Sequence, residues 1–427
     1  MGFQSGSFTA RDLVSAYLKR IQILDRSGPQ INSTLSLSPT VLDEADGLDR
    51  HLASTGGLRG KLNGIPVLVK DQTLRASSPH TDRLPQKPNA DATVDRKLKE
   101  SGALIFGKTM MAEWATAWFS ASSATDYAFT ENPYDLDRDV GASSGGSGAA
   151  VAANLCLLAV GEDTGGSIRL SSSFCNLTQD APGPIARTVT DCALMLDCMV
   201  GFKPQGNLTG YAATAAALGL PRGGSYAANL SSGVRKIQSA TFGVVRRFFG
   251  DGNDPDCAAV NSVMESAVAK PRSQGARFVD VHIPNLKHYM GSPLTFHRRY
   301  CSDINDFLAG KPDLPLLARD KFRRKVEMLT VSRGLDALVF PSVQVPPPRI
   351  DAENSRFWVD GEEVFPTNTF LASITRLPAV SLLAGFTADG LPVGMEIVGL
   401  GFQEQHLLEL AYGIDSVLQA RIAPRGL

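Results

Sequence analysis

The chain has 427 residues, of which 43% are hydrophobic and 20% are charged. This composition is typical of a folded globular protein and excludes extensive intrinsic disorder. The 42 basic and 43 acidic residues give a formal charge of −1, so no net field attracts the chain to nucleic acid or to an anionic membrane. We therefore expect no nucleic-acid partner.

The cysteines bear on the cellular compartment of the protein, and the lengths of its apolar runs bear on whether it spans a membrane. No run approaches the roughly 18 apolar residues that a spanning helix needs, and the first residues lack the order of a signal peptide, so we expect no membrane span. The six cysteines form no Cys-x-x-Cys pair and lie mostly in apolar segments, which favours reduced core thiols and a cytoplasmic location. Four Asn-x-Ser/Thr sequons leave a secreted form open, and they begin at Asn32, Asn176, Asn207 and Asn229.

The first hundred residues alternate between helix and strand patterns. Thr9 and Asp12 form a predicted capping box, and apolar residues at helical spacing follow until Gly28. Further helices are expected at residues 39–53 and 93–101, and buried strands at residues 65–69 and 103–106. This alternation predicts an α/β sheet, with Lys70 directly after its first central strand.

Residues 141–173 concentrate Gly and Ser around an apolar stretch, which predicts folded loops joined by a helix and a strand rather than a flexible linker. Thr188 and Asp191 predict the cap of another helix. Later patterns predict strands at 241–245, 279–283, 335–343, 378–386 and 392–399, helices at 255–269, 315–332 and 404–420, and loops at 202–235 and 345–348. No boundary divides the chain, so we expect one domain over residues 1–427, with a Gly/Ser-rich core at about 60–200.

Residues 102–109 match the GxxxxGK[ST] pattern of a phosphate-binding loop. Such a loop needs backbone N–H groups that are free to bind phosphate oxygens, whereas residues 103–106 indicate a buried strand. We therefore reject a nucleotide site here.

Residues 141–145 match Gly-x-Ser-x-Gly, the nucleophile elbow of α/β-hydrolases. That motif needs a preceding strand and later acid and histidine partners, whereas residues 132–138 indicate a polar turn. The later histidines lie in no evident signature, and they are His282, His288, His297 and His406. We do not favour the elbow, and without paired His or Cys spacing we expect no metal.

Lys70, Ser143 and Ser167 remain as candidates for catalysis. A lysine among apolar residues has its ammonium form disfavoured, so its pKa falls and it can accept a proton from a serine hydroxyl. Gly165 and Gly166 would let successive N–H groups before Ser167 face one oxyanion. Spacing alone leaves the plainer alternative open, in which the loops are turns and Lys70 is a surface charge.

Five ordered segments resemble the amidase signature family, and the likeness runs over nearly the whole chain. They are GIPVLVKD at 64–71, NPYD at 132–135, GASSGGSGAAVAA at 141–153, GEDTGGSIR at 161–169 and PGPIARTVTD at 182–191. Residues 377–399 also resemble the closing strands of that family. The resemblance implies an α/β fold, a single large domain with a central mixed β-sheet covered by helices, and amide hydrolysis by a Ser-Ser-Lys triad.

The resemblance also implies roles for individual residues. It makes Ser167 the acyl nucleophile, Ser143 the bridging serine in a cis peptide, and Lys70 the base. The oxyanion hole would consist of the backbone N–H groups of Thr164, Gly165, Gly166 and Ser167. No cofactor and no metal are implied, the expected substrate is a small-molecule carboxamide, and a homodimer stays open.

Several departures from the family pattern bear on this prediction. Ala142 replaces the glycine that usually precedes the bridging serine, and Glu162 stands where a threonine is frequent. The chain runs from Cys175 into PGPIART without the usual glycine-rich stretch, and the segment between Lys70 and Asp91 is short. Two alternatives stay open, a glutamyl-tRNA amidotransferase A-type subunit with partner subunits, and a catalytically inactive member that acts as a binding protein.

Overall fold

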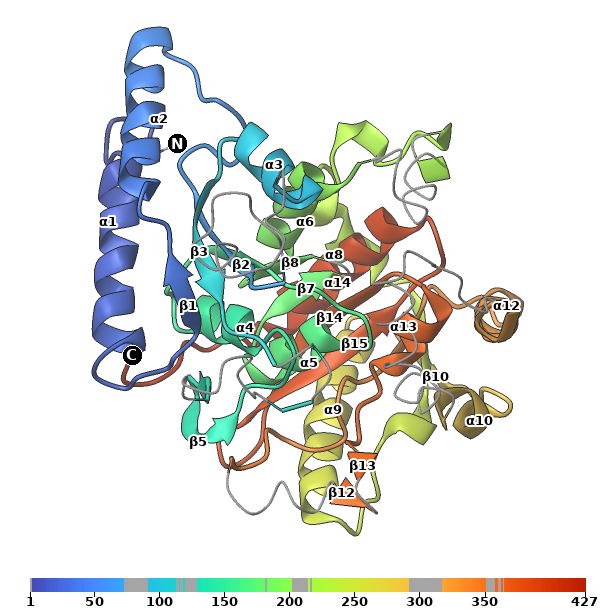
Figure 1. Ribbon diagram of the computed structural model, residues 1–427. Helices are drawn as coiled ribbons and strands as arrows, with labels where there is room; N and C mark the ends of the chain where they lie inside the picture. The colour runs from blue at the N-terminus through green and yellow to red at the C-terminus, as the bar shows by residue number, and fades with distance from the viewer. Residues whose placement is uncertain are drawn as a thin grey trace.

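One mixed sheet organises the chain (Figure 1). The computed structural model describes residues 2–72, 91–112, 115, 118–119, 129–180, 183–201, 214–215, 217–291, 317–350, 358–359, 362–363 and 365–427. The strands are β1 (Thr34–Leu37), β2 (Pro66–Lys70), β3 (Leu104–Thr109), β4 (Glu131–Asn132), β5 (Asp135–Asp139), β6 (Leu158–Val160), β7 (Thr178–Asp180), β8 (Pro184–Ala186), β9 (Thr241–Val244), β10 (Arg277–Asp280), β11 (Ala337–Pro341), β12 (Trp358–Val359), β13 (Glu362–Glu363), β14 (Ala379–Phe386) and β15 (Pro392–Val398).

Within the described residues the sheet has eleven strands in the order β1-β3-β2-β6-β8-β7-β14-β15-β11-β9-β10. The neighbours β3, β2 and β6 are parallel, the pairs from β6 to β11 are antiparallel, and β9 and β10 run parallel to β11. The expected fold class, α/β with a central mixed sheet, is therefore confirmed.

Helices cover both faces and the edges of this sheet (Figure 1). They are α1 (Ala10–Arg20), α2 (Val41–Thr55), α3 (Thr93–Glu100), α4 (Gly145–Ala152), α5 (Ser167–Phe174), α6 (Val189–Met199), α8 (Gly233–Lys236), α9 (Pro255–Ser273), α10 (Leu286–Gly291), α12 (Leu317–Ser332), α13 (Phe370–Thr375) and α14 (Glu404–Leu418). The predicted capping box of Thr9 and Asp12 begins α1, and the hydroxyl of Thr188 caps α6 as expected.

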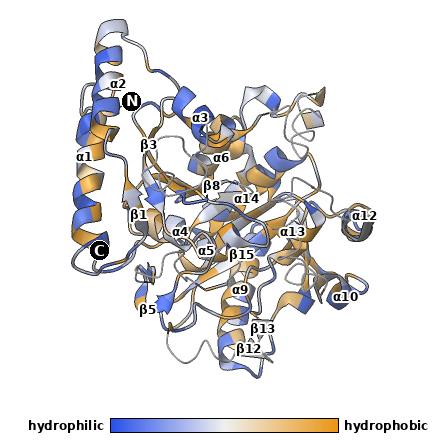
Figure 2. Cartoon of the chain, viewed as in Figure 1, coloured by the Kyte–Doolittle hydropathy of each residue, from blue (hydrophilic) through white to orange (hydrophobic). Residues whose placement is uncertain are grey.

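Alternate residues of the central strands enter different layers, because successive side chains of a strand point to opposite faces. Leu68 of β2 packs with α1, α2 and α4, whereas Val67 and Val69 pack with α3 and α6. Figure 2 shows the hydrophobic residues gathered on these strands and on the helix surfaces that meet them. Lys70 follows Leu68 by two residues, so its side chain enters the layer of α4 and α5.

The other half of the sheet repeats this arrangement. Leu338 and Phe340 of β11 pack with α12 and α13, whereas Val339 packs with α9 and α14. The short helix α8 crosses α14 closely, and a Cβ on Gly233 would lie 1.8 Å from the carbonyl oxygen of Glu409. Glycine is therefore required where these two helices meet.

Three predicted elements differ from the structure. β10 occupies 277–280 rather than 279–283, because this edge strand is mostly exposed and its register is set by the pairing of Arg277 with Thr241 rather than by its apolar residues. The expected polar turn at 132–138 is the small hairpin of β4 and β5, outside the main sheet. The expected loop 202–235 contains, in its described part, short helical turns and the start of α8.

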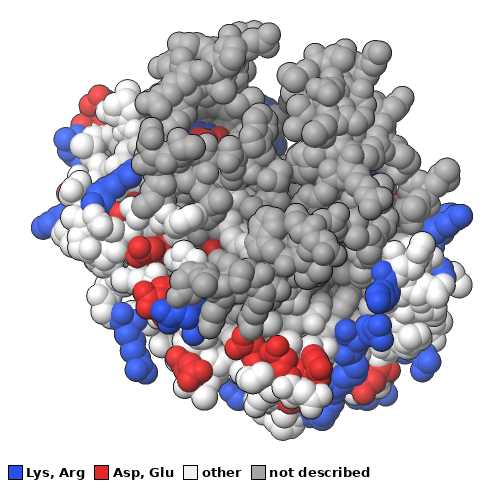
Figure 3. All heavy atoms as spheres, turned by 60° about the horizontal axis from the view of Figure 1, so that its bottom comes forward, with Lys and Arg blue, Asp and Glu red and all other residues white. Residues whose placement is uncertain are grey.

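The described cysteines are free and buried, as predicted, and Cys301 lies outside the described residues. Of the sequons, Asn176 is fully buried and inaccessible in the folded chain, Asn229 is exposed, and Asn207 lies outside the described residues. Among the helices that the structure describes, none has the length and hydropathy of a bilayer-spanning segment. Basic and acidic side chains both occur on the face in Figure 3, in keeping with the formal charge of −1.

Candidate active site

Lys70 is the last residue of β2 and is fully buried. Its Nζ atom donates a hydrogen bond to Oγ of Ser143 at 2.7 Å and another to the carbonyl oxygen of Glu162 at 3.3 Å. The Glu162 carboxylate lies 3.6 Å from the same nitrogen. The structure therefore brings Lys70 and Ser143 into direct contact in the interior, and Lys70 is not a surface charge.

Burial lowers the pKa of Lys70 to about 8, although the carboxylates of Glu162 and Asp163 oppose the shift. Asp71 takes no part in this balance, because it faces the buried Lys108. Nζ of Lys108 donates to the Asp71 carbonyl oxygen at 2.8 Å and lies 3.9 Å from its carboxylate. A substantial share of Lys70 is thus neutral at mildly alkaline pH.

Ser143 lies in the loop before α4 and is fully buried. The peptide bond between Ala142 and Ser143 is cis, as the resemblance implied, and Ala142 is buried too. The carbonyl oxygen of Ser143 accepts from the N–H of Ala112 at 3.2 Å. The N–H of Ala142 donates to the carbonyl oxygen of Trp118 at 3.0 Å, so two backbone hydrogen bonds hold this loop.

The glycines of the α4 segment have a packing reason. A Cβ on Gly146 would lie 2.5 Å from the carbonyl oxygen of Ser33 and 2.6 Å from backbone atoms of Met110. All eight residues of α4 are buried, so only a chain of very small side chains can pass this close to the strands. The Gly/Ser composition therefore reflects tight packing rather than flexibility.

Ser167 is the first residue of α5 and is almost buried, with 6% of its surface exposed. The two serine loops touch, since the N–H of Ser144 donates to the carbonyl oxygen of Ser167 at 3.2 Å. Within the described residues the hydroxyl of Ser167 makes no hydrogen bond, and in particular none to Ser143.

The N-terminal end of α5 leaves several backbone donors unused. The N–H groups of Ile168 and Arg169 both donate to the carboxylate of Asp163, at 3.2 Å each. The four preceding N–H groups, from Thr164 to Ser167, donate to no group in the described part of the chain. Successive free N–H groups at a helix start can bind a developing oxyanion.

Thr369 fixes the conformation of this glycine pair. Gly166 has φ of 129°, and a Cβ there would lie 1.8 Å from Oγ1 of Thr369. The same hydroxyl donates to the carbonyl oxygen of Gly165 at 2.9 Å. Gly166 is thus required both for its backbone angle and for the approach of residue 369.

A buried guanidinium anchors the loop from behind. Arg169 pairs with Asp163 at 2.9 Å and with Glu396 of β15 at 2.5 Å, and it donates to the carbonyl oxygen of Thr369 at 2.7 Å. Burial alone would raise the pKa of Asp163, but the Arg169 guanidinium holds it below its ordinary value. The loop that carries Ser167 is therefore tied to the far half of the sheet.

The structure also decides the motifs that we rejected. Residues 104–109 form the buried strand β3, so they cannot be a phosphate loop. His406 lies 3.4 Å from Asp336 and away from Ser143, and His297 lies outside the described residues. No group of three potential metal ligands occurs among the described residues.

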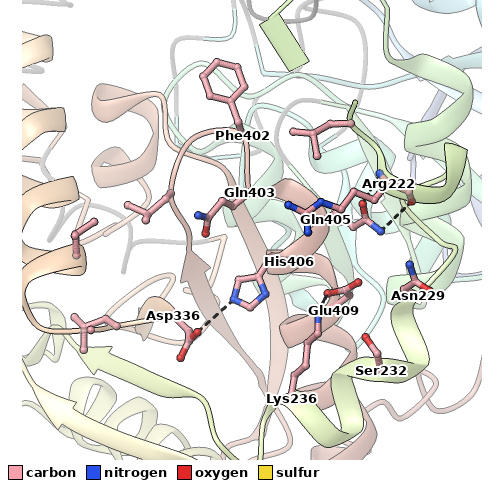
Figure 4. Close-up of a pocket in the computed structure, with 15 residues that line it drawn as sticks. Arg222, Asn229, Ser232, Lys236, Asp336, Phe402, Gln403, Gln405, His406 and Glu409 are labelled. Carbon is pink, nitrogen blue, oxygen red and sulfur yellow. Dashed lines mark hydrogen bonds and ion pairs between the residues drawn. The ribbon is translucent and has the colours of Figure 1, made fainter. Parts of the chain in front are cut away.

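A separate cavity of about 780 Å³ lies between α8, α14 and the turn before β11 (Figure 4), and the three candidate residues do not line it. Several of its polar side chains are engaged: the Gln405 amide binds the backbone N–H and carbonyl oxygen of Arg222, Lys236 pairs with Glu409, and His406 pairs with Asp336. We therefore assign no chemistry to this cavity.

Sequence reasoning missed the side chains that support the site from a distance. Thr369 and Glu396 lie more than 200 residues from Ser167, and no local motif signals their contacts. Phe370 and Trp118 were missed as well, although both lie beside Gly165, where a Cβ would be 3.1 Å and 3.4 Å away from their rings. Only an alignment of homologues or the fold itself could have identified them.

Comparison with known proteins gives a consistent result. A family model described as Amidase matches residues 12–178 and 314–408. The A-type subunit of the glutamyl-tRNA(Gln) amidotransferase of Pseudomonas savastanoi pv. phaseolicola (strain 1448A / Race 6) is 31% identical over 487 residues, which covers 97% of this chain and 95% of that protein. Because 487 exceeds the length of this chain, the relative carries residues that this chain lacks.

Solved structures are similar over nearly their full length. The peptide amidase PAM in complex with the competitive inhibitor chymostatin has a TM-score of 0.80 and 26% identity, with 99% of this chain and 97% of that chain covered. Native peptide amidase from Stenotrophomonas maltophilia has a TM-score of 0.77 and 26% identity, with coverages of 99% and 96%.

The buried Glu396 generates a stability prediction. Burial raises its pKa to about 7, although Arg169 opposes the shift. A carboxyl whose pKa is raised by folding contributes its full stabilisation below its ordinary pKa and loses that contribution as the pH rises through the raised value. We expect the wild type to lose stability relative to Glu396→Gln between pH 5 and pH 8, by on the order of 3 kcal/mol. Urea unfolding at both pH values measures this, and an equal difference at the two would contradict it.

Proposed function

We propose that this chain, which belongs to the amidase signature family, hydrolyses the amide bond of a small-molecule carboxamide through Lys70, Ser143 and Ser167. Its family membership makes it an amidase-family hydrolase. The finer proposal rests on the buried 2.7 Å contact between Nζ of Lys70 and Oγ of Ser143, beside the loop that presents Ser167. A lysine buried against a serine hydroxyl has the protonation chemistry that a proton relay needs.

In the proposed mechanism neutral Lys70 accepts the proton of Ser143 while Ser143 accepts that of Ser167, whose hydroxyl turns toward it. Oγ of Ser167 attacks the carbonyl carbon, and the C=O electron pair moves onto oxygen. As the tetrahedral intermediate collapses, the proton passes back through Ser143 to the leaving amine. Water then repeats these steps on the acyl-enzyme and releases the acid.

The backbone supports the stabilisation of the intermediate. The unused N–H groups from Thr164 through Gly165 and Gly166 to Ser167 lie at the start of α5, where they would donate to the oxyanion. The backbone N–H groups that donate to the Asp163 side chain in the described part of the chain are those of Ile168 and Arg169, so this carboxylate does not compete for the four donors before them.

The aromatic side chains beside this loop favour a substrate whose acyl group is apolar. Trp118 and Phe370 meet edge to face with ring centroids 5.0 Å apart, and both rings lie against Gly165 of the proposed oxyanion loop. An acyl chain bound at this loop would contact rings rather than charges. The similarity to peptide amidases is compatible with such a substrate.

A second candidate function is that of an amidotransferase A-type subunit. The 31% identity over nearly the whole of such a protein favours it, and that role would require partner subunits and ammonia transfer. The third alternative, an inactive member that binds a ligand, gains weight from the residues that this chain lacks. The buried Lys70–Ser143 contact favours hydrolysis over an inactive role.

A serine-directed fluorophosphonate should label Ser167 and no other serine, because among the described serines this one combines the proposed proton relay with a loop of N–H groups that donate to no described residue. Ser167→Ala should abolish labelling and lower kcat/KM by a factor of about 10³ or more, with an unchanged unfolding transition. Peptide mapping by mass spectrometry locates the label. Labelling at Ser143 would support the nucleophile elbow, and no labelling would support the inactive member.

The pH dependence should report Lys70. Because the pKa of Lys70 is about 8 and only the neutral amine accepts a proton, kcat/KM should rise with pH and level off above that value. Lys70→Arg should be as damaging as Lys70→Ala, each lowering kcat/KM by on the order of 10²–10⁴. Initial rates from pH 5.5 to 10 measure both. An arginine variant that keeps most of its activity would reduce Lys70 to a positioning charge.

The purified chain should hydrolyse a simple anilide, the amide of an arylamine, without ATP, added metal or any partner chain, since the proposed relay consists of its own side chains. Release of the arylamine, followed by absorbance, measures the rate. Turnover that needs ATP and copurifying chains would favour the amidotransferase role, and loss of turnover on adding EDTA would overturn the Ser-Ser-Lys mechanism.

A further inference from the structure

Glu162 contacts the proposed base, Lys70, and two residues near the proposed serines in the sequence, Ser144 and Thr164. Its Oε2 atom lies 3.6 Å from Nζ of Lys70, and its Oε1 atom accepts from the hydroxyl of Thr164 at 2.5 Å. Its backbone carbonyl oxygen accepts from Lys70, and also from Oγ of Ser144 at 3.1 Å. Oε2 is shielded from solvent and has no hydrogen-bond partner among the described residues, so its interaction with Lys70 is electrostatic.

The other charges around Lys70 are engaged elsewhere. On β3 the side chain of Lys108 binds Asp71, and Lys70 itself pairs in register with the uncharged Thr109. From the loop after β6, Asp163 also faces Lys70, but two of its hydrogen bonds go to the guanidinium of Arg169. The helix α4 contributes only small uncharged residues.

We propose that Glu162 is a positioning residue that favours the ammonium form of Lys70 and so sets the pH above which the hydrolase becomes active. The inference rests on the proposed function, because it assigns a regulator to the proposed base. A carboxylate at 3.6 Å stabilises a buried ammonium group far more than it would in water. The carboxylate also holds the hydroxyl of Thr164, so one side chain connects the base to the proposed oxyanion loop.

The direction in which Glu162 shifts the pKa of Lys70 follows from two opposing influences, burial and the nearby carboxylates. Burial lowers the pKa of Lys70 to about 8 even though Glu162 opposes the shift. Without that carboxylate, burial is opposed chiefly by the smaller influence of Asp163, so the pKa falls further.

Glu162→Gln tests the proposal, because glutamine keeps the shape and an acceptor for Thr164 but removes the charge. We expect the midpoint of kcat/KM against pH to fall by about one pH unit or more, with an unchanged plateau near pH 10. Activity at pH 6.5 should therefore rise several-fold. Asp71→Asn is the matched control, since it removes the adjacent carboxylate that faces Lys108, and its midpoint should remain at the wild-type value.

The outcomes separate this inference from the proposed function. A wild-type enzyme that hydrolyses amides, with a Glu162→Gln profile superimposed on its own or lowered at every pH, would overturn the role of Glu162 alone. If no variant hydrolyses an amide, the proposed function fails, and the titration of Lys70 is then read directly. For that measurement the chain is labelled with ¹³Cε-lysine and the Lys70 resonance is assigned with Lys70→Arg. A midpoint that falls in Glu162→Gln sustains the inference, and an unchanged midpoint refutes it.

Discussion

The burial of one ammonium group is the constraint on which the rest of the site depends. Lys70 is the last residue of β2 and has no exposed surface. Its ammonium group must therefore either bind polar atoms or lose its proton and become neutral. The surroundings provide one hydroxyl, one carbonyl oxygen and one carboxylate at a slightly greater distance. This environment leaves both protonation states accessible near neutral pH, which is the property that a proton relay requires.

A second buried cation anchors the loop that carries Ser167. Arg169 follows Ser167 by two residues, and its carboxylate partners come from the loop before α5 and from β15. If the loop that carries Ser167 moved, one of these ion pairs would break and leave an uncompensated charge in the interior. The loop is therefore held firmly in this position. Thr369 adds a steric constraint, since it occupies the space that a side chain on residue 166 would need. The strands that contribute to these contacts, β2 and β15, lie at residues 66–70 and 392–398 of one sheet, so the site depends on segments far apart in the chain.

Small residues allow the charged groups to meet. The glycines of α4 let its backbone approach Ser33 and Met110, and this approach places Ser143 over the end of β2. A larger residue at 146 would push the helix outward and lengthen the contact between Lys70 and Ser143. Small side chains also suit the buried serines of this region, and the hydroxyls of Ser144 and Ser171 donate to nearby backbone carbonyl oxygens.

The sequence by itself determined the elements whose cause is local. The α/β alternation, the capping box at Thr9, the N-cap at Thr188 and the strand that leads into Lys70 all follow from residues within a few positions of one another. The Gly/Ser loops indicated Ser143 and Ser167 as candidates, and the family resemblance implied their roles. Only the tertiary structure decided that Lys70 is buried against Ser143, that Glu162 faces it and that Thr369 and Glu396 support the loop. These contacts join residues that are 73 to 227 positions apart in the sequence, whereas the contacts of Asp163 with its neighbours are local. No periodicity in the sequence encodes a contact between residues so far apart.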